Sequence, residues 1–168
     1  MNEVLKYSVS WLIYLFFQVF LFNYLVLFQV ATPFVFLLFV LTLPFDLPKY
    51  ILYPLAFFMG LCVDIFSENL ATGLHAFSAL LVIGLRPYLL SLIASSNVRN
   101  VTEISFASQT NIWVASFLFP LIFIHHLAYF LLEAMTFSNF LYTLWKVVAS
   151  SIYTFLWTFL LAFIFYKR

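Results

Sequence analysis

The chain has 168 residues, of which 66% are hydrophobic and only 8% carry a charge. Ordinary soluble domains have roughly 25% charged residues, so this composition leaves too little polar surface to cover a water-soluble globule. The formal net charge of +1 gives no argument for a nucleic-acid partner, and the single cysteine, Cys62, allows no disulfide within the chain. The composition therefore predicts an all-α protein that crosses a membrane several times.

The apolar runs and the short polar turns between them leave room for six crossings of about 20 residues each. The expected helices of a single transmembrane domain, residues 1–168, cover residues 4–22, 32–44, 49–66, 73–93, 112–135 and 140–166. Six crossings place five basic residues on the same side of the membrane, namely Lys6, Lys49, Arg99, Lys167 and Arg168. Because cytoplasmic loops carry the excess of Lys and Arg, both termini are expected to be cytoplasmic.

The second of these helices is the shortest. Thr32 and Pro33 resemble a helix cap followed by proline at the first helical position. A helix from Pro33 to Leu43 spans only about 17 Å, well short of a hydrocarbon core about 30 Å thick. Either the helix extends back to Val26 with a kink at Pro33, or the membrane thins locally.

Two small residues and a carboxylate share one face of the third expected helix. Ala56, Gly60 and Asp64 lie four residues apart, a spacing that lets helix backbones approach closely inside a bilayer. An ionisable residue in such a segment faces protein rather than lipid. We expect this face to pack against another helix of the chain, with contact to a partner or to lipid as the alternative.

Arg86 is set deep in the fourth apolar segment. It lies about 15 Å below Asp64 along the bundle, which is too far for a direct ion pair. Arg86 is therefore expected either to anchor the helix by reaching the inner lipid headgroups or to meet a partner protein. In the loop that follows, Arg99 and Glu103 are further candidates for partner contact.

Glu133 and Lys146 flank the turn between the last two helices at similar depth. An ion pair between them would relieve the free-energy penalty on both side chains. A metal site at His125, His126 and Glu133 is disfavoured, because adjacent helical residues point about 100° apart and a metal needs convergent ligands. Hydrogen bonding between helices is the better interpretation of the two histidines.

The sequence holds no glycine-rich phosphate loop, HExxH or GxSxG motif. We therefore expect a protein that is not an enzyme and binds no cofactor. Such a chain acts through its membrane faces and short loops.

Several short motifs, in their order and spacing, resemble the rod shape-determining protein MreD family of bacteria. The matching residues are Leu43-Pro44-Phe45 with Pro48, Gly60-Leu61, Val63-Asp64, Gly73-Leu74-His75, Arg86-Pro87, His125-His126-Leu127, Leu132-Glu133-Ala134, Phe137-Ser138-Asn139 and Tyr166-Lys167-Arg168. The likeness covers essentially the full length of the chain.

This resemblance implies a subunit of the cell-elongation machinery in the bacterial inner membrane. The implied partners are the bitopic protein MreC, the glycosyltransferase RodA with its penicillin-binding transpeptidase, the actin-like MreB, and membrane lipids. The implied fold is similar to the six-helix substrate-binding subunit of energy-coupling-factor vitamin transporters.

That implied fold raises an alternative function, the binding or transport of a vitamin-sized molecule. The transporter subunits typically carry an Ala-x-x-x-Ala pattern in their first helix, where they contact the energising module. Residues 1–30 of this chain contain neither alanine nor glycine, which favours the elongation subunit over the transporter.

Overall fold

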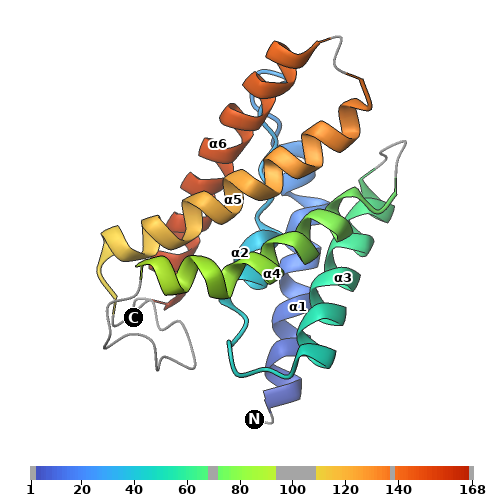
Figure 1. Cartoon of the computed structure of the whole chain (residues 1–168). Coiled ribbons are helices and arrows are strands. Elements are labelled where there is room, and N and C mark those ends of the chain that lie inside the picture. The colour runs from blue at the N-terminus through green and yellow to red at the C-terminus, as the bar shows by residue number, and fades with distance from the viewer. Residues whose placement is uncertain (1–2, 68–71, 94–108, 137–138, 167–168) are drawn as a thin grey trace.

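Five long helices form the body of the protein in the computed structural model, which describes residues 3–67, 72–93, 109–136 and 139–166. They are α1 (Glu3–Phe20), α3 (Lys49–Phe66), α4 (Leu74–Ile93), α5 (Asn111–Ala134) and α6 (Phe140–Tyr166) (Figure 1). Each is long and apolar enough to cross a membrane. Apolar runs of this length become helices because only a helix satisfies every backbone polar group within one segment. The all-helical class is thereby confirmed, and the five helices agree with the expectation of a multi-pass membrane protein, whereas six such helices were expected; within the described residues, 32–44 form no helix of that length.

The long helices begin and end close to the expected residues. The ranges of α3 and α6 are those expected, and α4 and α5 differ by one residue at their ends. The first helix is shorter than expected, since α1 ends at Phe20 and a single 3₁₀ turn, η1 (Phe22–Tyr24), follows it.

The expected second helix, residues 32–44, is wrong over its first third. The structure has only the seven-residue α2 (Phe36–Thr42), and residues 25–35 are not helical. A tight turn occupies the preceding residues, where Leu27 and Ala31 exchange backbone hydrogen bonds of 2.9 and 3.0 Å. Phe28 and Gln29 within it have φ angles of 52° and 58°, a left-handed conformation that ends any helix. Neither a kinked helix from Val26 nor a helix starting at Pro33 is present.

Residues 25–48, here called the crossing segment, carry the chain back across the bundle. α1 and α3 run parallel, since Trp11 Nε1 donates to the Leu55 carbonyl at 3.4 Å near the middle of both helices and Asn23 Nδ2 donates to Ser67 Oγ at 3.3 Å beyond their ends. We call the end of the bundle where α1, α3 and α5 finish the upper end, and the opposite end the lower end (Figure 1). The crossing segment descends from the upper to the lower end. Its first part, residues 25–35, is here called the non-helical half, and α2 follows it.

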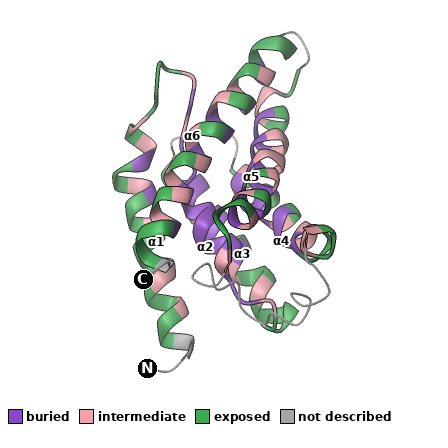
Figure 2. Ribbon diagram, turned by 90° about the vertical axis from the view of Figure 1, so that its left-hand side faces the viewer, coloured by how far each residue is buried: buried purple, intermediate pink, exposed green. Residues whose placement is uncertain are grey.

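The buried core is centred on α2. Its residues from Phe36 to Leu41 are at most 3% exposed, and Figure 2 shows α2 buried between the longer helices, which expose their outer sides. Around it, α4 packs against α3 and α5, α6 packs against α5, and α1 contacts α3. A short helix surrounded on every side needs no polar face, which explains why its sequence is uniformly apolar.

Gly60 allows α3 and α4 to approach closely. A Cβ atom at this position would lie 2.6 Å from the backbone N and Cα of Ala76 in α4. Ala56 and Asp64, on the same face of α3, are also buried. The small-residue face is therefore filled by α4, and its residues serve packing within the chain.

Replacing Gly60 by alanine should force α3 and α4 apart, because the clash is with backbone rather than with a movable side chain. We expect a loss of about 1–3 kcal/mol in the free energy of unfolding, measured in detergent. Gly84→Ala is the matched control, since the nearest atom there is the Tyr53 hydroxyl at 3.8 Å. Equal stability of the two variants would contradict this packing.

Candidate functional site

Three buried side chains hold the backbone of the non-helical half. Gln18 of α1 donates from Nε2 to the Pro33 carbonyl at 3.1 Å, and its Oε1 accepts the Phe36 N–H at 3.1 Å. From α6, Ser150 Oγ accepts the Thr32 N–H at 3.1 Å and Thr154 Oγ1 accepts the Phe34 N–H at 2.9 Å. All three side chains have no exposed surface. Non-helical backbone is tolerated at membrane depth only when protein groups satisfy it in this way.

Thr154 continues this network into α5. Its Oγ1 lies 3.0 Å from His126 Nε2, and His126 Nδ1 lies 2.8 Å from the Ile122 carbonyl. A carbonyl only accepts, so Nδ1 carries the proton and Nε2 accepts from the Thr154 hydroxyl. The amide of Phe34, the Thr154 hydroxyl and the His126 ring thus form one directed chain of hydrogen bonds from the crossing segment to α5.

His75 of α4 and His125 of α5 complete a buried aromatic cluster around Phe34. The ring centroids of His75 and His125 are 5.7 Å apart, and that of Phe34 lies 4.4 Å from His75. Within the described residues no group of three His, Cys, Asp or Glu side chains is placed to hold a metal ion. Interhelical hydrogen bonding was expected of both His125 and His126. It agrees with the contact of His126 to α6, but it is wrong for His125, whose two ring nitrogens have no hydrogen-bond partner within the described protein.

Asp64 joins the upper end of α3 to the start of α4. Its two carboxylate oxygens accept the N–H groups of Gly73, His75 and Ala76 at 3.0–3.2 Å. These amides belong to the first turn of α4 and the residue before it, where no helical partner exists and where a negative charge is favourable. Asp64 therefore caps α4 from the neighbouring helix, the packing role expected for it.

The expectation for Arg86 is wrong. The side chain neither reaches the headgroups nor faces a partner, because it is 1% exposed. Its Nη2 donates to the carbonyl of Leu43, and the guanidinium lies 4.4 Å from the ring centroid of Phe45. Leu43 directly follows the last residue of α2, so its carbonyl lacks a helical partner. Arg86 supplies that partner from α4 and fixes the lower half of the crossing segment.

Glu133 and Lys146 meet across the hairpin of α5 and α6, as their positions indicated. Lys146 Nζ lies 2.7 Å from Glu133 Oε2, with the side chains 24% and 34% exposed, respectively. Lys146 Nζ also lies 4.5 Å from the ring centroid of Phe130. Arg99 and Glu103, the two candidates in the loop after α4, lie outside the described residues.

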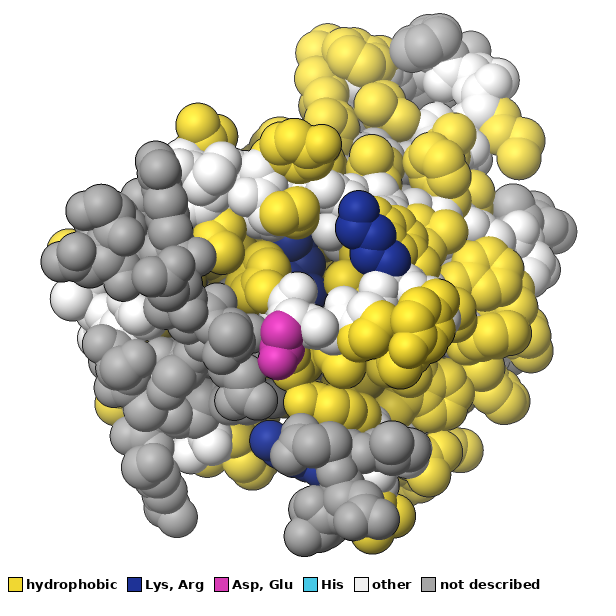
Figure 3. All heavy atoms as spheres, turned by 60° about the horizontal axis from the view of Figure 1, so that its bottom comes forward, with side chains coloured by type: hydrophobic (Ala, Val, Ile, Leu, Met, Phe, Trp, Pro, Cys, Tyr) yellow, Lys and Arg dark blue, Asp and Glu magenta, His cyan; other side chains and the backbone are white. Residues whose placement is uncertain are grey.

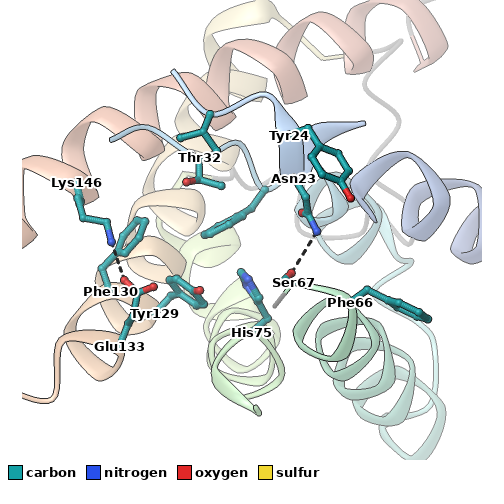
Figure 4. A pocket seen from close by; sticks show the side chains of 12 residues that line it. Asn23, Tyr24, Thr32, Phe66, Ser67, His75, Tyr129, Phe130, Glu133 and Lys146 are labelled. Carbon is teal, nitrogen blue, oxygen red and sulfur yellow. Dashed lines mark hydrogen bonds and ion pairs between the residues drawn. The ribbon is translucent and has the colours of Figure 1, made fainter. Parts of the chain in front are cut away.

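A cavity of about 360 Å³ opens at the upper end, between these groups (Figure 4). The Glu133–Lys146 pair forms one wall, and the hydrogen-bonded Asn23 and Ser67 lie opposite. Thr32 and Phe34 of the crossing segment, His75, Tyr129, Phe130, Tyr24, Val26 and Phe66 complete the lining. The non-helical half therefore lines this cavity, as unwound segments of membrane proteins commonly do.

Sequence reasoning did not find this cavity. Its lining comes from three stretches far apart in the sequence, residues 23–34, 66–75 and 129–146, and includes Thr32 and Phe34, which were expected to be helical. The sequence marks His75 only as part of the Gly73-Leu74-His75 motif. Its polarity in an apolar run was the one available signal for a buried contact.

Comparisons with protein-family models, curated proteins and solved structures find no match to this chain. The expected similarity to the substrate-binding subunit of energy-coupling-factor transporters therefore stays a prediction.

Thr154→Val should destabilise the protein by about 1–3 kcal/mol, because it leaves the buried Phe34 N–H and His126 Nε2 without partners. Thr158→Val is the matched control: Thr158 is equally buried, but its hydroxyl donates only to carbonyls of its own helix at 2.9 and 3.1 Å. Thermal unfolding in detergent measures both variants. If the control lost as much stability as Thr154→Val, the hydroxyl would not hold the crossing segment.

Glu133→Gln and Lys146→Met should each destabilise the α5–α6 hairpin, and the double variant should lose less than the sum. We expect a coupling free energy of about 1 kcal/mol, the scale found for polar pairs in membrane proteins. Leu141→Met, on the 82% exposed Leu141 of α6, controls for a lipid-facing change. Strictly additive losses would show that the pair contributes no stability.

Proposed function

We propose that the chain is a non-enzymatic integral subunit of the bacterial cell-elongation complex in the inner membrane. In this role it binds MreC and helps to organise lateral peptidoglycan synthesis, and thereby cell shape, beside RodA with its transpeptidase and the actin-like MreB. The proposal rests on the resemblance of its motifs to the MreD family.

One observation on the structure supports this proposal: the motif residues contact one another. Arg86 binds Leu43 and Phe45, and Asp64 binds the Gly73 and His75 amides. These motifs lie up to 43 residues apart in sequence. Members of one family share a fold, so the motifs that they share are expected to include residues that contact one another and stabilise it. Asp64, Arg86 and His126 each bind backbone groups, a use that favours structure over catalysis.

The proposed orientation places the lower end of the bundle, and both termini, in the cytoplasm. Lys6 and Lys49 lie near the starts of α1 and α3, at this end. Figure 3 looks onto the same end and shows basic side chains set in a hydrophobic surface. An excess of basic residues is typical of the cytoplasmic side.

The outer face of α6 is the surface that we propose for MreC. The Ala56–Gly60–Asp64 face and Arg86 were candidates for partner contact, but they are buried within the chain. The α6 face replaces them. Exposed apolar residues follow α6 along its whole length, namely Leu141, Trp145, Val148, Ile152, Leu156, Leu160 and Phe163. The opposite face is fixed by Ser150 and Thr154. A rigid helix loses little entropy when a single partner helix packs along it.

Site-specific photo-crosslinking in membranes tests this surface. A crosslinking amino acid at Leu156 on α6 should capture MreC, whereas the same group at Leu12 on α1 should not. The two positions form a matched pair because each is 59% exposed. Capture from Leu12 alone would place the interface on α1, and the absence of MreC from both would contradict the proposed partnership.

A further inference from the structure

The cavity at the upper end carries charges that cancel. Among the described residues that line it, the charged ones are Glu133 and Lys146, 2.7 Å apart. A ligand with a net charge would leave that charge uncompensated near the hydrocarbon, which is unfavourable. A zwitterion can instead place an ammonium beside Glu133 and an anionic group beside Lys146. It thereby replaces one ion pair by two.

The remaining lining suits such a ligand. Tyr129 and Phe130 lie next to Glu133 in Figure 4, and aromatic rings favour a nearby cation. His75 is 1% exposed, and its Nδ1 atom has no hydrogen-bond partner within the described protein. A buried polar atom without a partner is unfavourable, and a bound polar group would satisfy it. The cavity volume, about 360 Å³, suits a small group.

An apolar groove adjoins the cavity and indicates where the ligand comes from. The groove has a volume of about 420 Å³ and is lined by the α1 residues Leu12, Ile13, Leu15, Phe16, Phe17, Val19 and Phe20 together with Phe66 of α3. Phe66 also lines the polar cavity. A polar cavity at the level where helices end, continued by an apolar groove along the helices, matches the two parts of a phospholipid.

We propose that the upper cavity binds the zwitterionic headgroup of a phosphatidylethanolamine, with one acyl chain in the groove between α1 and α3. Its phosphate pairs with Lys146 and its ammonium with Glu133, which also receives hydrogen bonds from the ammonium. Phosphatidylcholine has the same net charge but its quaternary ammonium has no N–H to donate. Phosphatidylglycerol is anionic: its phosphate can pair with Lys146, but it has no cation to pair with Glu133. This site is separate from the α6 face proposed for MreC.

Native mass spectrometry of the full-length wild-type protein, released from vesicles of equal parts of the three lipids, tests the preference. We expect phosphatidylethanolamine to be retained about tenfold over phosphatidylglycerol, a ratio that one favourable charged contact supplies, and above phosphatidylcholine. This arm requires no variant, so it does not depend on any substitution being tolerated. Equal retention of the three lipids would overturn the proposal.

Variants then assign the preference to the cavity. The neutral double variant Glu133→Gln with Lys146→Met should lose the preference, whereas Lys49→Met, at the lower end, should keep it. Phe66→Ala should weaken retention of the lipid. An undiminished preference in the double variant would overturn the site. If free phosphoethanolamine displaced the lipid and Phe66→Ala had no effect, the ligand would be a soluble zwitterion and the lipid assignment would be wrong.

Discussion

Residues 31–35, the last part of the non-helical half, place polar backbone groups inside an apolar bundle, and these groups must be bonded there. Gln18, Ser150 and Thr154 provide those bonds from the first and last helices of the chain. Each bond is individually modest, but an unsatisfied amide at this depth is unfavourable by several kcal/mol. The contact between chain segments about 120 residues apart therefore decides whether the crossing segment can leave the helical conformation.

Other features of the fold follow from this constraint. Because residues 25–35 are not helical, α2 is short and can be enclosed entirely, so that it forms the apolar centre of the core. Arg86 of α4 bonds the Leu43 carbonyl just after α2, and Thr154 of α6 bonds the Phe34 N–H just before it. Neighbouring helices therefore hold the crossing segment on both sides of α2. The same unwinding creates the cavity at the upper end, since Thr32 and Phe34 line it. The buried polar side chains thus bond the backbone of the crossing segment. The cavity is lined by a buried polar atom without a hydrogen-bond partner within the described protein, His75 Nδ1.

The sequence predicted the parts of this structure that depend on local pattern. Long apolar runs gave the limits of α3 to α6 nearly to the residue, and similar depth in a hairpin brought Glu133 to Lys146. The prediction of a helix over residues 32–44 was wrong because Thr32-Pro33 is typical of a helix start. The left-handed turn at Phe28 and Gln29 has no glycine or asparagine to signal it. The prediction for Arg86 was wrong because its partner is a backbone carbonyl, which no side-chain pattern reveals. The pairing of Ser150 and Thr154 with residues 32–34 depends on tertiary contact alone.

Amide hydrogen exchange in lipid nanodiscs, resolved by residue, tests most directly whether side chains hold the non-helical half. The amides of Thr32 and Phe34 have no helical partner, yet they should exchange as slowly as amides in the interior of α4, because Ser150 and Thr154 bind them. The exposed turn at Phe28 supplies the fast reference. Exchange of Thr32 and Phe34 at the rate of Phe28 would contradict the account.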